Sequence, residues 1–83
     1  MSYSLAIYRG ASKTLAKIPS PDYERIRDAI RELANNPRPF GCKKLIGRPA
    51  WRIRVGNYRA IYEINDKKQI ITVVDVGHRK DVY

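Results

Sequence analysis

The chain has 83 residues, enough for one domain and too few for two, so we expect a single domain over residues 1–83. Its 17 Lys and Arg against 8 acidic side chains give a net charge of +9, which attracts polyanions such as nucleic acid, or an acidic protein. One Cys, one His and no apolar run approaching about 20 residues exclude an internal disulfide, a Cys/His metal cluster and a membrane-spanning helix. We therefore expect a soluble, cytoplasmic protein with no metal, no cofactor and no membrane partner.

The first residues predict a strand and a short helix. Residues 3–9 alternate loosely between apolar and polar side chains, a pattern typical of a strand, and Gly10 ends it. Residues 11–18 then place apolar side chains at helical spacing. Pro19 ends this helix because proline has no backbone N–H to donate.

A second helix is predicted to begin at Pro21 and to end before Pro37. Ser20 is the expected N-cap, and the carboxylates of Asp22 and Glu24 suit the positive end of the helix dipole. The apolar stripe along this helix consists of Tyr23, Ile26, Ile30 and Leu33. Such a stripe needs a sheet to pack against.

The second half of the chain predicts three strands. Residues 37–50 are rich in Pro and Gly and indicate an extended connection, after which residues 51–55 alternate with period two. A tight turn leads into a strand over residues 58–64, and residues 69–76 form a β-branched run typical of a central strand. The order β-α-α-β-β-β predicts a two-layer α+β fold, in which an N-terminal strand and a helical hairpin pack on a small antiparallel sheet.

The strand over residues 51–55 predicts a basic sheet face. Trp51, Ile53 and Val55 alternate with Arg52 and Arg54, so the two guanidinium groups project away from the core. They lie about 7 Å apart along the strand, comparable to successive phosphates of a nucleic acid, and arginine binds phosphate with two parallel hydrogen bonds. The alternative is a solvated basic face of a half-exposed sheet.

Further cations are predicted to converge on this face. Arg59 begins the next strand, just across the turn from Arg54, and the last strand leads into a tail that carries His78, Arg79 and Tyr83. If the last strand pairs beside the strand of Arg59, its end delivers the tail to the same surface. The alternative for the tail is an ordinary frayed, basic chain end.

Cleavage of RNA without a metal would give these side chains distinct tasks. The 2′-hydroxyl must lose a proton, the phosphorane must be stabilised, and the leaving 5′-oxygen must gain a proton. Arginine serves the second task but carries protons poorly. The imidazole of His78 carries protons readily, whereas the phenol of Tyr83 does so only where neighbouring cations lower its pKa.

Two segments resemble the RelE/ParE toxin superfamily of type II toxin–antitoxin systems. They are WRIRVGNYRAIYEI at residues 51–64 and VDVGHRKDVY at residues 74–83, and the KKL before the first segment fits as well. The resemblance implies a RelE-like enzyme, an endoribonuclease that cleaves mRNA in the ribosomal A site and is wrapped and neutralised by a cognate antitoxin, which we expect to be acidic. By position, it implies catalytic roles for Arg59, Arg79 and Tyr83 and RNA-binding roles for Lys44, Arg52, Arg54 and His78.

Two other functions stay open at this point. A ParE-like toxin inhibits DNA gyrase without cleaving RNA and shares the fold and the basic hairpin, but that branch generally lacks the C-terminal Arg/Tyr arrangement. A plain nucleic-acid-binding module would need only the basic sheet face. Arg79 and Tyr83 therefore favour the nuclease.

Overall fold

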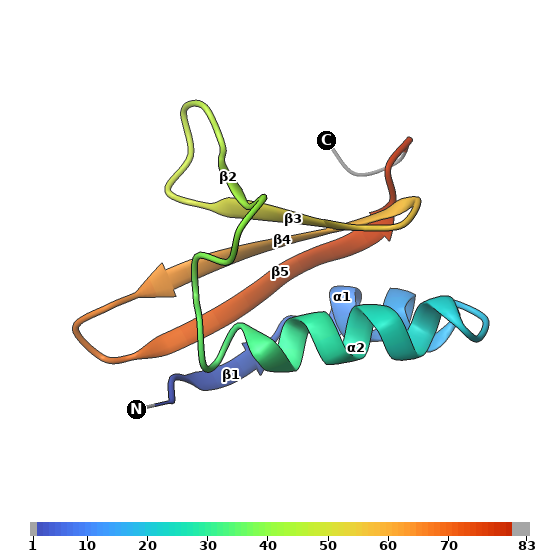
Figure 1. Ribbon diagram of the computed structural model, residues 1–83, viewed down its shortest axis with the longest axis horizontal. Helices are drawn as coiled ribbons and strands as arrows, with labels where there is room; N and C mark the ends of the chain where they lie inside the picture. Colours follow the sequence, from blue (N-terminus) through green and yellow to red (C-terminus); the bar gives the residue numbers. More distant parts are fainter. Residues whose placement is uncertain (1, 81–83) are drawn as a thin grey trace.

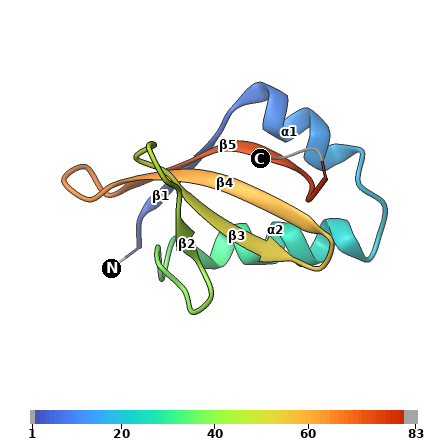
Figure 2. The ribbon, with the colours of Figure 1, turned by 90° about the horizontal axis from the view of Figure 1, so that it is seen from above.

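The computed structural model describes residues 2–80 and shows a sheet of five strands with two helices on one of its faces (Figure 1). The elements in chain order are β1 (Ser4–Ile7), α1 (Arg9–Ala16), α2 (Asp22–Glu32), β2 (Lys43–Lys44), β3 (Trp51–Val55), β4 (Tyr58–Asn65) and β5 (Ile70–His78). Seen from above, α1 lies along the β5 side of the sheet and α2 along the β3 side (Figure 2). The predicted two-layer α+β fold is confirmed.

The strand order is β1-β5-β4-β3-β2, and β2 to β5 form the predicted antiparallel meander. The first strand differs from the expected antiparallel sheet because β1 pairs with β5 in parallel, so the sheet is mixed. A two-residue strand, β2, also lies inside the segment that was expected to be a connection without secondary structure. The β-branched run forms β5, an interior strand between β1 and β4, whereas the central strand of the five is β4.

Both helices begin at positions that differ slightly from the prediction. Helix α1 starts at Arg9, two residues earlier than expected. Helix α2 starts at Asp22 with Pro21 in the N-cap position, so Ser20 is not the N-cap. Ser20 instead donates a hydrogen bond from Oγ to Oε2 of Glu24 at 2.7 Å, which lowers the pKa of that carboxyl.

The main core lies between the helices and the sheet, where the stripe of α2 meets the central strands. Its largest fully buried side chains are Ile26, Leu33, Tyr62, Ile71, Val73 and Val76. Tyr62 is fully enclosed, and its hydroxyl donates to the carbonyl oxygen of Pro37 at 2.8 Å. Burial raises the pKa of Tyr62, so the phenol stays protonated, and this bond anchors the connection after α2 to the sheet.

A smaller apolar cluster lies on the opposite face of the sheet, which we call the outer face. Leu45 and Ala50 come from the connection between β2 and β3 and pack on Ile61 of β4, with Val74 of β5 beside them. The two ends of this connection therefore pack on the outer face, while residues 46–49 between them are exposed and project away from the sheet (Figure 1).

A β-bulge in the β4–β5 pairing explains how Val74 reaches this cluster. Ile61 pairs with Asp75, but the next residue, Tyr62, pairs with Val73, so Val74 is the extra residue. A bulge of this kind changes which face the following side chains occupy. The outer face of β5 beyond the bulge therefore carries different residues from those that simple alternation would place there.

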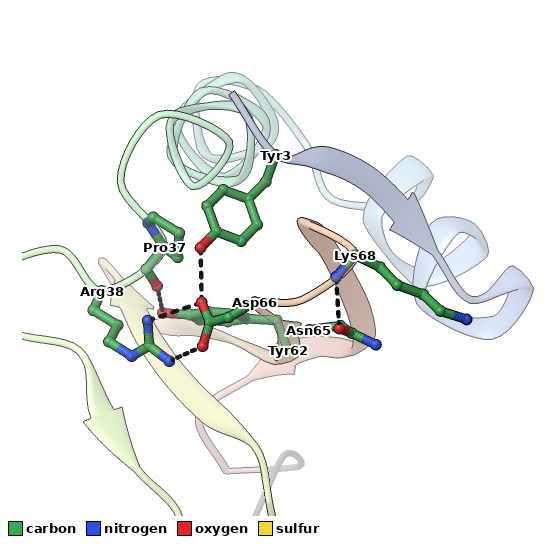
Figure 3. Close-up of polar contacts among 7 residues, drawn as sticks. All are labelled: Tyr3, Pro37, Arg38, Tyr62, Asn65, Asp66 and Lys68. Carbon is green, nitrogen blue, oxygen red and sulfur yellow. Dashed lines mark hydrogen bonds and ion pairs between the residues drawn. The ribbon is translucent and has the colours of Figure 1, made fainter. Parts of the chain in front are cut away.

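A polar cluster holds three separate segments together at the turn between β4 and β5 (Figure 3). Asp66 accepts a hydrogen bond from Nη2 of Arg38 at 3.0 Å and another from the hydroxyl of Tyr3 at 2.7 Å. The Arg38 guanidinium also lies 5.0 Å from the centre of the Trp51 ring, within range of a cation–π interaction. These contacts, that from Arg38 foremost, lower the pKa of Asp66, and donation to this carboxylate raises the pKa of Tyr3.

Candidate nucleic-acid interface

The outer face carries a group of cations that we call the basic face. Its members are Lys43, Arg52, Arg54 and Arg59. Ile53 is buried against the helices, so its neighbours Arg52 and Arg54 project to the outer face. Residues directly opposite each other in an antiparallel pair share a face, which places Lys43 with Arg52 and Arg59 with Arg54.

The pair of Arg54 and Arg59 concentrates positive charge at one end of this face. Side chains of a directly opposite pair begin about 5 Å apart, and like charges directly opposite each other are destabilising. Arg54 is exposed and Arg59 is half-buried. A bound phosphate would relieve the repulsion, since one anion can contact both guanidinium groups.

Arg52 adds a half-buried guanidinium group to this face. Its Nε atom is buried, and among the described residues no acceptor lies within hydrogen-bond distance of it. A buried donor without an acceptor is unfavourable by about 1–3 kcal/mol. The predicted position of Arg52 on a phosphate-binding face is consistent with this geometry.

Arg79 lies at the same end of the sheet as Arg54 and Arg59. It directly follows β5, and its backbone N–H donates to the carbonyl oxygen of Asn57 in the β3–β4 turn at 2.8 Å. The turn that Asn57 belongs to directly joins the strands of Arg54 and Arg59. The structure thus brings three of the predicted arginines to one end of the sheet, from three different strand ends.

His78 does not join these arginines. It pairs with Tyr58, whose side chain packs against the main core, so His78 lies on the helix side of the sheet. The two rings meet edge to face with their centres 5.6 Å apart, and Nδ1 of His78 accepts a hydrogen bond from the backbone N–H of Lys80 at 3.2 Å. The expected placement of His78 on the RNA-binding face is therefore wrong.

Lys44, like His78, does not belong to the basic face. It pairs with Trp51, whereas its neighbour Lys43 pairs with Arg52, so Lys43 is the lysine that joins the arginines. The Nζ atom of Lys44 lies 3.4 Å from the carbonyl oxygen of Arg48, to which it donates a hydrogen bond. This register could not be predicted from the sequence, because β2 is two residues long and lies in a Pro- and Gly-rich segment.

Tyr83 lies outside the described residues, so its predicted catalytic role stays a prediction. Within residues 2–80, no group of three His, Cys, Asp or Glu side chains is placed to hold a metal ion, and no helix is long and apolar enough to cross a membrane.

Several large apolar side chains are exposed at the edges of the molecule. Leu5 and Ile7 are each 39% exposed on the edge strand β1, and Phe40 and Ile46 are almost fully exposed near β2. A hollow of about 420 Å³ opens between α2 and β3, with Phe40 at its wall and a mostly apolar lining. Exposed apolar surface of this kind is typical of protein-binding regions.

Comparisons with known proteins agree on one group of relatives. The family model described as the ParE toxin of the type II toxin-antitoxin system, parDE, matches residues 7–83. The chain is 30% identical over 83 residues to the mRNA interferase toxin RelE of Escherichia coli K12, which covers 96% of this chain and 86% of that protein.

Solved structures give the same result. The archaeal RelE–RelB complex from Pyrococcus horikoshii OT3 contains a chain that superposes with a TM-score of 0.85 at 30% identity, covering 99% of this chain and all of that one. The intact E. coli RelBE toxin–antitoxin complex contains a chain with a TM-score of 0.81 at 29% identity, covering 93% of this chain and 96% of that one.

Proposed function

This chain belongs to the family of ParE toxins of type II toxin–antitoxin systems, and we propose that it is an mRNA interferase of the RelE kind that cleaves mRNA in the ribosomal A site. The observation that carries the proposal is the meeting of Arg54, Arg59 and Arg79 at one end of the basic face. Arginines that start from three neighbouring strand ends can reach a single phosphate from several directions.

The chemistry of RNA cleavage accounts for such a cluster. Attack of the 2′-oxygen on the adjacent phosphorus produces a phosphorane with additional negative charge. Guanidinium groups held in place by a sheet stabilise this charge without having to reorganise, and they stay protonated throughout. In this proposal Arg59 and Arg79 bind the scissile phosphate, while Arg52, Arg54 and Lys43 hold the RNA backbone.

The relatives named ParE leave a second candidate, a toxin that inhibits DNA gyrase and does not cleave RNA. The matching family model carries that name, although the relative reported above at 30% identity is named an mRNA interferase. The two functions differ in what happens to cells that produce the toxin. Gyrase inhibition gives DNA breaks with full-length mRNA, and an mRNA interferase gives cut mRNA.

A cognate antitoxin is the proposed protein partner. The relatives of known structure include complexes of RelE with RelB. An acidic antitoxin would neutralise the net charge of +9 and cover exposed apolar side chains such as Leu5, Ile7 and Phe40. The mRNA and the ribosomal A site are the other proposed partners.

Primer extension on a translated mRNA tests the enzymatic proposal. Cells that produce the wild-type chain should show cuts within codons, and Arg59→Ala should reduce cutting by at least about 100-fold because the phosphorane loses a preorganised cation. Arg25→Ala removes an equal charge from the exposed surface of α2 and should leave cutting unchanged. Full-length mRNA together with gyrase-dependent DNA breaks in wild-type cells would refute the proposal and favour the second candidate.

A further inference from the structure

The basic face needs a proton acceptor that the predicted site does not provide within the described residues. Arginine stays protonated, and His78 lies on the other face of the sheet. The 2′-hydroxyl of RNA must nevertheless lose its proton as it attacks phosphorus. One carboxylate of the outer face lies next to the arginines, and it belongs to Asp75 of β5.

The register of β4 and β5 places Asp75 close to the phosphate-binding end of the face. Asp75 pairs with Ile61, and Gly77, two residues further along β5, pairs with Arg59. Asp75 and Arg59 are therefore diagonal neighbours on adjacent strands, with a separation of about 7–8 Å at the start of their side chains. This register puts a carboxylate within one side chain's reach of a phosphate bound by Arg59.

The β-bulge is the reason that a carboxylate occupies this position. Val73 and Val76 both face the main core, although they are three residues apart, because Val74 is the extra residue of the bulge. Asp75 consequently shares the outer face with Ile61 and is exposed. Bulges are enriched beside active sites, where they redirect a side chain.

We propose that the carboxylate of Asp75 accepts the proton of the attacking 2′-hydroxyl. The O–H bond breaks and its proton passes to Asp75, while the 2′-oxygen forms a bond to phosphorus. The bond from phosphorus to the 5′-oxygen then breaks, and this oxygen takes a proton from water, leaving a 2′,3′-cyclic phosphate and a 5′-hydroxyl. Asp75 returns its proton to water. This inference rests on the proposed function.

Glu63 is the natural comparison because it is a second carboxylate on the outer face. It pairs with Thr72, on the other side of Ile61 from Arg59. Its surroundings are the turn between β4 and β5, where Lys67 and Lys68 lie near it around a shallow hollow. Glu63 is thus too far along the strand to serve a phosphate at Arg59, which makes Glu63→Gln a matched control.

The direction in which Asp75→Asn changes the cleavage rate distinguishes a role in proton transfer from a purely electrostatic role. Replacing Asp75 by Asn removes a negative charge from a basic face, so RNA binding should stay equal or become tighter. If Asp75 acted only through its charge, Asp75→Asn would cleave as fast as the wild type or faster. If Asp75 accepts the proton, Asp75→Asn should cleave more slowly despite equal or tighter binding.

The test measures single-turnover cleavage of mRNA on programmed ribosomes, together with RNA affinity and thermal unfolding of each variant. We expect Asp75→Asn to cleave about 100-fold more slowly or worse, Asp75→Glu to recover part of the rate, and Glu63→Gln to remain within about twofold of wild type. Folded Asp75→Asn and Asp75→Ser proteins that cleave at the wild-type rate would overturn the inference. Wild-type protein that fails to cleave would instead overturn the proposed function itself.

A modified substrate identifies which proton Asp75 transfers. An mRNA with sulfur in place of the scissile 5′-oxygen has a better leaving group that needs no proton from an acid. For a proton acceptor, the defect of Asp75→Asn should persist with this substrate. If the sulfur substrate restores the wild-type rate, Asp75 acts as an acid toward the 5′-oxygen and the inference is wrong.

Discussion

Arg54→Ala gives the sharpest test of the basic face as an RNA-binding surface. Under the proposed function, phosphate contacts come from five cations, namely Lys43, Arg52, Arg54, Arg59 and Arg79. Each contact with single-stranded RNA changes the slope of log affinity against log salt by about 0.7, so five contacts give a slope of about −3.5. Wild-type affinity should therefore fall about 100-fold between 50 and 200 mM salt, and the affinity of Arg54→Ala about 50-fold.

Fluorescence anisotropy of a labelled, single-stranded RNA across this salt range measures both slopes. Arg25→Ala is the matched control, because it removes the same charge from α2 on the helix side of the sheet. Arg54→Ala should also leave the unfolding midpoint equal or raise it, since it relieves a like-charge pair with Arg59. Equal slopes for Arg54→Ala and the wild type would refute the assignment of this face as the RNA-binding surface. So would an equal loss of RNA affinity in Arg54→Ala and Arg25→Ala.

Two further predictions concern stability. Arg38 and Tyr3 hold the pKa of Asp66 below its usual 3.8. The contribution of the Asp66 carboxylate to the free energy of unfolding is therefore present above about pH 4 and is lost as the pH falls through the lowered pKa. Urea midpoints of the wild type and Asp66→Asn should therefore converge in acid, and a constant difference down to pH 2 would contradict this sign. The antitoxin should raise the melting temperature by about 10–20 °C at 100 times its dissociation constant, and equal melting temperatures would contradict the proposed partner.

The predictable parts of the fold are the elements whose buried side chains recur along the sequence at one regular spacing. The α2 stripe and the alternation of Trp51, Ile53 and Val55 with two arginines were correct because burial on one face forces that pattern on the sequence. Pairing of Arg54 with Arg59 followed from the tight turn between them. The parallel pairing of β1 with β5 was not predicted. The direction of β1 relative to β5 depends on the path of the chain between the two strands, and no residue of β1 indicates it.

The side chains at the end of β5 are harder to place from the sequence, because the face that they occupy depends on one extra residue. In a β-branched run such as β5, apolar side chains occur at successive positions, so the sequence does not reveal which residues face the core. Regular alternation from Ile71 and Val73 would put His78 on the outer face and Asp75 in the core. The bulge at Val74 reverses both placements, since Val76 becomes the core residue and the side chains beyond it exchange faces. The same irregularity thus removes the imidazole from the arginines and supplies a carboxylate in its place.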